Sequence, residues 1–169
     1  MIAKLFRRLT ANPGSGTALF DWATRTARDR DWYGDGSIPD TIDGRFAMVS
    51  TVTALCCLRL EQLGAEGEAL SIALTERFAQ VMESEHRELG IGDPGLGKTV
   101  LKLVGSLARR VDALRPAMTG NSSWAAAAAA ALPPASDEAV TAWRAKQLET
   151  LARQLRSASI GDLARGAIR

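Results

Sequence analysis

The run Gly-Asp-Pro-Gly-Leu-Gly-Lys-Thr at residues 92–99 is the part of the chain whose residue types and spacing most suggest chemistry. It fits the P-loop pattern, in which backbone groups and a lysine bind the phosphates of a nucleotide. A working P-loop lies between a buried strand and a helix, because the strand aims the loop and the helix N-terminus at the phosphate. The preceding residues, 83–89, are charged and helical in pattern. We therefore interpret the match as a coincidence at a turn between two helices, with nucleotide binding as the weaker alternative.

Other reactive side chains are few. The one histidine, His86, lies among glutamates, which is typical of a solvated helix face. Cys56 and Cys57 are adjacent in an apolar segment, where helical side chains diverge by about 100° per residue, so we expect two reduced thiols in the core. These side chains do not assemble into a catalytic or metal-binding set. The sequence therefore predicts a protein that is not an enzyme, with no cofactor, no metal and no catalytic residue.

Composition favours one domain. The chain has 169 residues, 46% of them hydrophobic, and a formal net charge of +2. That length suits a single core, and the charge gives no reason to expect DNA as a partner. We expect an arm over residues 1–16 and a helical domain over residues 17–169, with a connector at 116–123. No apolar run reaches the ~20 residues of a membrane span, and the arm lacks the apolar core of a secretory signal, so we expect a soluble protein of a reducing compartment.

Helical periodicity runs through nearly the whole chain, and no segment shows the alternation of a strand. The predicted fold class is all-α, a single compact multi-helix domain. Helices are expected over residues 17–31, 44–63, 68–89 and 96–114, and from Ser136 through Leu155. Segment 44–63 is apolar around most of its circumference, which predicts that it is the central helix.

Two sets of basic residues are candidates for contact with an anionic partner. The helix expected over residues 96–114 has an apolar stripe on one side and Lys98, Lys102 and Arg109 on the opposite side. Their partner would be membrane headgroups or ribosomal RNA, and an ordinary solvated face is the alternative. The arm carries a second set, for which the same alternatives hold because adjacent apolar residues could lie in a bilayer interface. This set is Lys4, Arg7 and Arg8.

Four short motifs follow one another along the chain. They are Ile-Pro-Asp-Thr-Ile-Asp-Gly-Arg-Phe at 38–46, Leu-Arg-Leu at 58–60, Arg-Glu-Leu-Gly-Ile-Gly-Asp at 87–93 and Gly-Lys at 97–98. In this order they resemble the ubiquinol-cytochrome c chaperone family, over roughly residues 19–115. The resemblance implies an all-helical, non-enzymatic assembly factor for respiratory complex III, a family whose mitochondrial members bind newly made cytochrome b.

The implied function is that of a holding chaperone, which covers a client before it gains its partners. The implied client is cytochrome b or another membrane protein, with contact to the inner-membrane surface or the ribosome and with a second assembly factor as a further partner. The implied location is the cytoplasm, peripheral to the inner membrane of a bacterium, or the mitochondrial matrix of a eukaryote. A helical adaptor with a different protein client is the alternative.

Candidate site residues concentrate around the first motif. Aromatic residues near a helix junction are common in interfaces, so client contact is expected at Trp32, Tyr33 and Phe46, together with Arg45, and core packing is the alternative. We expect Asp40 or Thr41 to cap a helix and Arg45 to reach a carboxylate such as Asp93. The residues expected to have structural roles in the motifs are Pro39, Asp40, Asp43, Gly44, Gly92 and Asp93.

Overall fold

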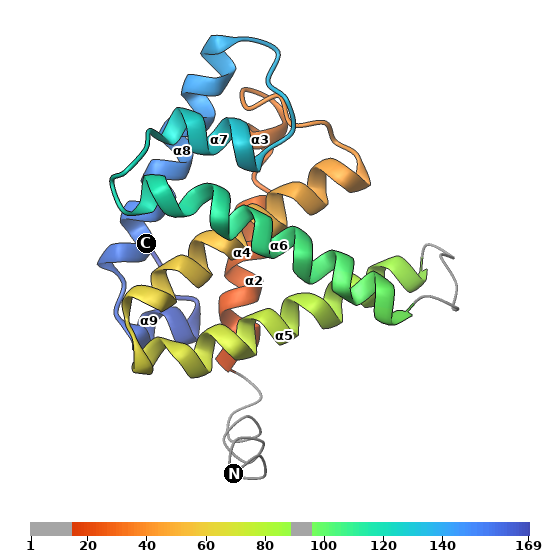
Figure 1. Cartoon of the computed structure of the whole chain (residues 1–169), viewed down its shortest axis with the longest axis vertical. Helices are drawn as coiled ribbons and strands as arrows, with labels where there is room; N and C mark the ends of the chain where they lie inside the picture. Colours follow the sequence, from red (N-terminus) through yellow and green to blue (C-terminus); the bar gives the residue numbers. More distant parts are fainter. Residues whose placement is uncertain (1–14, 89–95) are drawn as a thin grey trace.

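The computed structural model describes residues 15–88 and 96–169 of the chain, and these residues form helices only (Figure 1). The prediction of an all-α fold is therefore confirmed. The helices are α2 (Ser15–Ala27), α3 (Arg30–Tyr33), α4 (Ile42–Gln62), α5 (Ala65–Glu88), α6 (Leu96–Met118), α7 (Trp124–Ala131), α8 (Glu138–Ser157) and α9 (Ile160–Arg165).

Helix α4 is the centre of the fold, as its sequence predicted. It packs against α2, α5, α6 and α8, and its residues are buried along most of their length. Two buried hydroxyl groups are accommodated because they donate to carbonyl oxygens four residues earlier: Ser50 Oγ to Phe46 O and Thr51 Oγ1 to Ala47 O, each at 2.7 Å. Between its exposed ends, α4 therefore has no solvated face and is stabilised by the helices around it.

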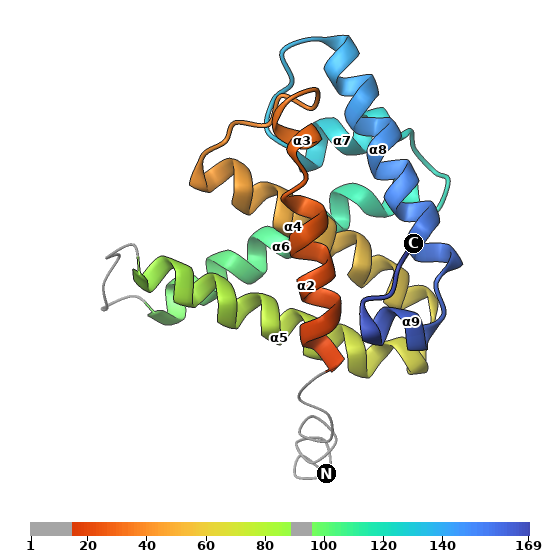
Figure 2. The ribbon, with the colours of Figure 1, turned by 180° about the vertical axis from the view of Figure 1, so that it is seen from behind.

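The other helices surround α4 in two groups. α2 and α5 pack against each other and against α4, and Figure 2 shows α2 lying in front of both. α6, α7 and α8 form a chain of contacts on the opposite side, where α6 crosses in front of α4 (Figure 1). Edge-to-face contact between Phe20 and Phe78, with ring centroids 6.3 Å apart, joins α2 to α5.

Helix α2 ends earlier than expected. The helix predicted over residues 17–31 is divided into α2 and α3, since the Asp29 carboxylate accepts a hydrogen bond from the backbone N–H of Asp31 at 3.1 Å and caps a new helix. The new helix is short, and it turns the chain so that Trp32 faces the core.

Helix α6 ends later than expected. It includes Pro116, which lies close to its last residue, Met118, and has no N–H to donate within the helix. The carbonyl oxygen of Pro116 accepts a hydrogen bond from the backbone N–H of Asn121 at 2.7 Å, which stabilises the end of the helix. The connector to α7 is therefore residues 119–123, and the expected connector at 116–123 overlaps the helix by three residues.

A buried arginine joins the C-terminal helices to the loop before α4. Arg144 of α8 is 1% exposed, and it donates hydrogen bonds to three backbone carbonyl groups. Its Nε bonds to Gly36 O at 2.6 Å, and its two terminal nitrogens bond to Pro133 O at 2.6 Å and Ser37 O at 3.1 Å. Burial lowers the pKa of this guanidinium. One side chain thus fixes two loops that are distant in sequence.

Both cysteine thiols are buried and unpaired in the core, as the sequence predicted. Burial raises the pKa of Cys57 to about 11 and that of Cys56 well above its usual value. We expect both thiols to react with an aromatic disulfide reagent at pH 8 at least about a hundredfold more slowly in the native protein than in urea, because the thiolate is the reactive form. Fast reaction of either thiol without denaturant would contradict the burial described here.

Two aspartates that cap helices make the stability of the fold depend on pH. The backbone N–H of Val140 and the hydroxyl of Ser136 lower the pKa of Asp137, and hydrogen bonds from Ser159 lower that of Asp162. A lowered folded-state pKa means that this stabilisation is complete above the unfolded value of about 3.9 and is lost progressively as the pH falls from there through the lower folded-state value. The urea midpoint should therefore fall between pH 7 and pH 3. An Asp137→Asn variant should lose less, since asparagine caps without titrating.

None of the helices in the described part of the chain is long and apolar enough to cross a membrane. The same residues contain no cluster of histidine, cysteine, aspartate and glutamate that could hold a metal ion.

Candidate functional site

Residues 38–46 form the N-terminal end of α4 and the loop that leads into it. Ile38 is buried and anchors the loop in the core. Thr41 is the N-cap, with its hydroxyl accepting a hydrogen bond from the backbone N–H of Gly44 at 3.1 Å, which confirms one of the two expected caps. This motif thus fixes where α4 begins and how its first turn is presented.

Gly44 is required by the packing of this turn. A Cβ atom at this position would overlap the carbonyl oxygen of Pro39 and approach the side chain of Ile38 at 3.4 Å. The loop therefore lies directly against the first turn of the helix, with no space for a side chain between them.

Arg45 pairs with the carboxylate of Asp40. Its Nε lies 2.6 Å from Asp40 Oδ1, and both side chains are exposed. The hydrogen bond from Arg45 lowers the pKa of Asp40. Asp93 lies outside the described residues, but the guanidinium is already engaged within its own motif, five residues away. The interaction therefore braces the loop before α4.

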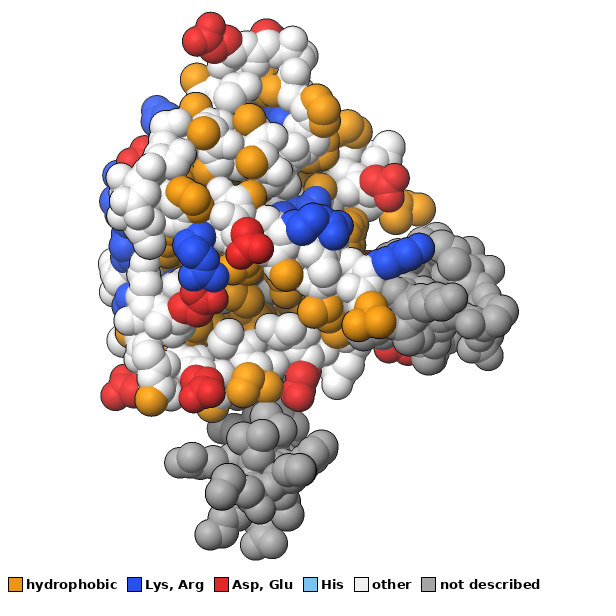
Figure 3. Space-filling model, in the orientation of Figure 1, with side chains coloured by type: hydrophobic (Ala, Val, Ile, Leu, Met, Phe, Trp, Pro, Cys, Tyr) orange, Lys and Arg blue, Asp and Glu red, His pale blue; other side chains and the backbone are white. Residues whose placement is uncertain are grey.

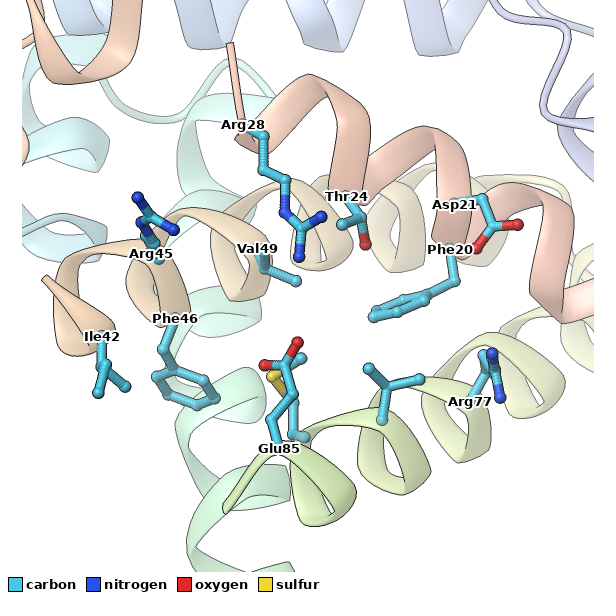
Figure 4. Close-up of a pocket in the computed structure, with 12 residues that line it drawn as sticks. Phe20, Asp21, Thr24, Arg28, Ile42, Arg45, Phe46, Val49, Arg77 and Glu85 are labelled. Atoms are coloured by element: carbon cyan, nitrogen blue, oxygen red, sulfur yellow. The ribbon is translucent and has the colours of Figure 1, made fainter. Parts of the chain in front are cut away.

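The first of three hollows around Phe46 is a cleft of about 560 Å³ between α2, α4 and α5. Phe20, Phe46, Val49, Val81 and Met82 give it apolar walls. Figure 4 shows charged side chains entering from opposite sides, with the guanidinium of Arg28, just after α2, and the Glu85 carboxylate of α5 pointing toward each other. The cleft could accommodate apolar side chains between walls of both charges.

The other two hollows lie between α4 and α6, and one of them extends to α7. This one, of about 540 Å³, is lined by the first turn of α4, by Arg109 and Arg110 of α6, and by residues 130–133 at the end of α7 and just after it. The second, of about 320 Å³, is lined by Ile42, Phe46, Lys102 and Arg109 among others. Phe46 lines all three hollows, so they surround one end of α4.

Arg110 is a site residue that the sequence analysis did not select. Its Cζ lies 5.9 Å from the centre of the Phe46 ring, a cation–π distance. Its Nη1 donates to the carbonyl oxygen of Ser106 at 3.2 Å. Burial, with the nearby charge of Arg109 as a smaller cause, lowers the pKa of Arg110. Nothing in the helical pattern of the sequence could show that this arginine faces a phenylalanine of another helix.

Apolar side chains beside these hollows are unusually exposed. Ile42 is 59% exposed and Leu101 is 73% exposed, and these are the exposed large hydrophobic residues of the described chain. Figure 3 shows hydrophobic side chains over α7 and along α6, with Lys and Arg side chains between them. We use the term α4 mouth for the surface formed by Ile42, Arg45, Phe46, Lys102, Arg109 and Arg110.

The structure brings together residues from two separately predicted sets. Phe46, expected to contact a client, lines the same hollow as Lys102 and Arg109, expected to contact an anionic partner, whereas Arg45 lines the cleft between α2, α4 and α5. Asp43 and Gly44 line the same hollow as Arg109. Two predicted sites are therefore one surface, because the start of α4 packs against α6.

Two predicted contact residues are instead occupied with packing. Trp32 is 4% exposed, its Nε1 donates to Thr26 O at 3.1 Å, and its ring contacts Trp143 edge to face at 5.4 Å. Tyr33 is half-buried, its hydroxyl donates to Ala27 O at 2.9 Å, and burial raises its pKa. Both side chains position the loop before α4, which is the role of core packing that the sequence left open.

The side chains of several predicted residues lie outside the part of the chain that the structure describes. Lys98 belongs to α6, but its side chain lies outside the described residues, as does that of His86. The described neighbours of the P-loop-like run are the helices α5 and α6, which fits a helix-to-helix connection. Wholly outside the described residues are Lys4, Arg7, Arg8, Gly92 and Asp93.

Comparisons with known proteins agree with this geometry. Residues 35–160 match the model of a family described as ubiquinol-cytochrome C chaperone. Among solved structures, the chain is similar to the crystal structure of the Cbp3 homologue from Brucella abortus, with a TM-score of 0.80 and 29% sequence identity over 99% of this chain and 95% of that one. No curated protein matches the chain. The matched range includes the whole α4 mouth.

Proposed function

The chain belongs to the ubiquinol-cytochrome c chaperone family, and from this premise we propose that it is a non-enzymatic assembly chaperone that holds newly made cytochrome b until ubiquinol-cytochrome c reductase is assembled. Since this client is a membrane protein, the holding step takes place beside the inner membrane, in the cytoplasm of a bacterium or in the mitochondrial matrix. A chaperone of this kind needs no ATP, because binding alone lowers the amount of free, aggregation-prone client.

The observation that supports this proposal is the α4 mouth. Residues 38–46 build a rigid helix start, and the hollows around Phe46 are open beside it. Ile42 and Leu101 are exposed, and Ile42 lies at the edge of two of these hollows, where apolar groups gathered on one surface are typical of protein interaction sites. An incoming apolar segment would cover these side chains and gain hydrophobic burial on its own side.

A strain without this protein tests the function. We expect a lower level of cytochrome b and a loss of ubiquinol-cytochrome c reductase activity, both restored by the wild-type gene. Ile42→Asp should restore them only in part, because it places a charge in the client surface without altering the core. Ala142→Asp, on the exposed side of α8, is the matched control and should restore them fully. Normal reductase in the deletion strain would contradict the proposal and favour the adaptor with another client.

Site-specific crosslinking identifies the client directly. Benzoylphenylalanine in place of Ile42 should crosslink to cytochrome b during its synthesis, because this side chain is at the edge of two hollows. The same group in place of the exposed Lys146 on α8 is the control and should give no such product. Crosslinks from position 42 to a different protein, with none to cytochrome b, would show that the client is another one.

A further inference from the structure

The two hollows between α4 and α6, one of which extends to α7, have an excess of positive charge. Lys102, Arg109 and Arg110 line them, and Asp43 is the only carboxylate among the described lining residues. The ion pairs found in the described chain involve other arginines, at positions 45, 115 and 165. The three cations in the hollows therefore have no carboxylate within ion-pair distance among the described residues.

Arg110 is the least exposed of these three cations. Its guanidinium is half-buried, its Nε is inaccessible to solvent, and this atom has no hydrogen-bond partner in the described part of the chain. Its other bonds go to Ser106 on its own helix, and the neighbouring charge of Arg109 is repulsive. A guanidinium that is partly removed from water in this way gains most from an incoming anion, since a charge-assisted hydrogen bond is stronger where water is excluded.

The walls around these cations are apolar. On one side are Phe46 and Ala47 of α4, and on the other side are Ala130, Ala131 and Leu132 from α7 and its end. Alanine side chains leave the surface of α7 free of long groups, so a second backbone could approach it closely. An occupant must therefore be apolar apart from its negative charge.

We propose that the hollow between α4, α6 and α7 binds an apolar polypeptide segment through one acidic side chain, whose carboxylate pairs with Arg109 and Arg110. This inference rests on the proposed function, because it describes the kind of client segment that the α4 mouth holds. A bilayer is the less suitable partner, since its headgroups contact protruding cations, whereas Arg110 is set back beside Phe46 in a concave surface. The expected partner is therefore an apolar segment with one acidic side chain, which becomes buried in the hollow.

The direct test uses a pair of fluorescent peptides and the purified full-length protein. Each peptide has about 14 residues, enough for four helical turns, with leucine and alanine in the centre, serine and glycine at the ends, and one central glutamate. The twin peptide carries glutamine in place of the glutamate. In anisotropy titrations the glutamate peptide should bind about tenfold more tightly, as expected for one charge-assisted hydrogen bond in a partly dry site.

Two variants with matched controls assign this binding to the hollow. Arg109→Gln should abolish the preference for glutamate. The control is Ala108→Glu, which lowers the net charge by the same amount at an exposed position of the same helix, outside the hollow. This variant should keep the preference. Ala130→Trp should fill the hollow and weaken both peptides about tenfold or more. Ala129→Trp, its exposed neighbour on α7 that does not line the hollow, should leave both affinities unchanged.

The possible outcomes distinguish a failure of this inference from a failure of the proposed function. Equal affinity for the two peptides, or a preference that persists in Arg109→Gln, would overturn the inference. Binding of phosphatidylglycerol vesicles that Ala130→Trp abolishes, with no peptide binding, would assign the surface to a membrane and overturn it as well. A deletion strain that loses reductase activity while the peptides show no preference would refute this inference alone. Normal reductase in that strain would refute the proposed function, whatever the peptides do.

Discussion

Replacing Arg144 with alanine is expected to lower the free energy of unfolding by about 3–5 kcal/mol, because hydrogen bonds to a charged donor contribute about 1.5–3 kcal/mol each and their losses do not add fully. The variant leaves the carbonyl groups of Gly36, Ser37 and Pro133 without their donor and creates a cavity where a nearly inaccessible side chain was. Unfolding in urea, followed by circular dichroism, measures the effect.

Arg153→Ala is the control for this variant. Arg153 is exposed on the same helix and donates only to Thr150, so its loss should change stability by less than about 0.5 kcal/mol. Arg144→Lys should lie between the two, since one ammonium cannot reach three carbonyl groups in the directions of a guanidinium. If Arg144→Ala were as stable as Arg153→Ala, the hydrogen bonds of Arg144 would contribute nothing to the fold.

Gly44→Ala is expected to destabilise the protein by about 1–3 kcal/mol, the usual cost of overpacking, and to weaken client binding. The added methyl group overlaps Pro39 O, so the loop 38–41 must move away from the first turn of α4. The Arg45 to Asp40 ion pair depends on that loop, and so does the edge of the hollow that Pro39 and Thr41 line. Stability and peptide affinity should therefore fall together.

Gly105→Ala is the matched control, because it makes the same change inside a helix with free space. A Cβ atom at position 105 would meet only the Arg109 guanidinium, at 3.8 Å, so alanine there should stabilise the protein by about 0.5–1 kcal/mol through helix propensity. Opposite signs for the two glycine variants are the expected result. A stabilising effect of Gly44→Ala would show that the loop does not lie against the helix.

The sequence was sufficient to predict the long helices α4, α5, α6 and α8, because their packing follows the helical period. Leu70, Leu74 and Phe78 were expected along one side of α5, and all three are buried. Lys102 and Arg109 were expected on the opposite side of α6 from its apolar stripe, and both are exposed. Such positions depend on neighbours three or four residues away, which the sequence shows directly.

The residues of the site were harder to predict from the sequence, because the site depends on contacts between segments that are distant along the chain. Trp32 and Phe46 look equivalent in the sequence, as aromatic residues beside a helix junction, yet Trp32 is buried against Trp143 while Phe46 lines the hollows. The difference is made by α8, more than a hundred residues later than Trp32. Arg110 and Arg144 were not selected for the same reason, since each acts on a different element of the fold.

The position of Arg144 also has a consequence for the timing of translation. The loop before α4 is held by a side chain 108 residues further along the chain, so a ribosome has made residues 38–46 long before it adds the residue that anchors them. A nascent copy therefore carries residues 38–46 for some time before α8 emerges and holds the loop in place. Competence to receive a client would then arrive only near the end of synthesis, and products that terminate before α8 would not compete with the finished protein for it.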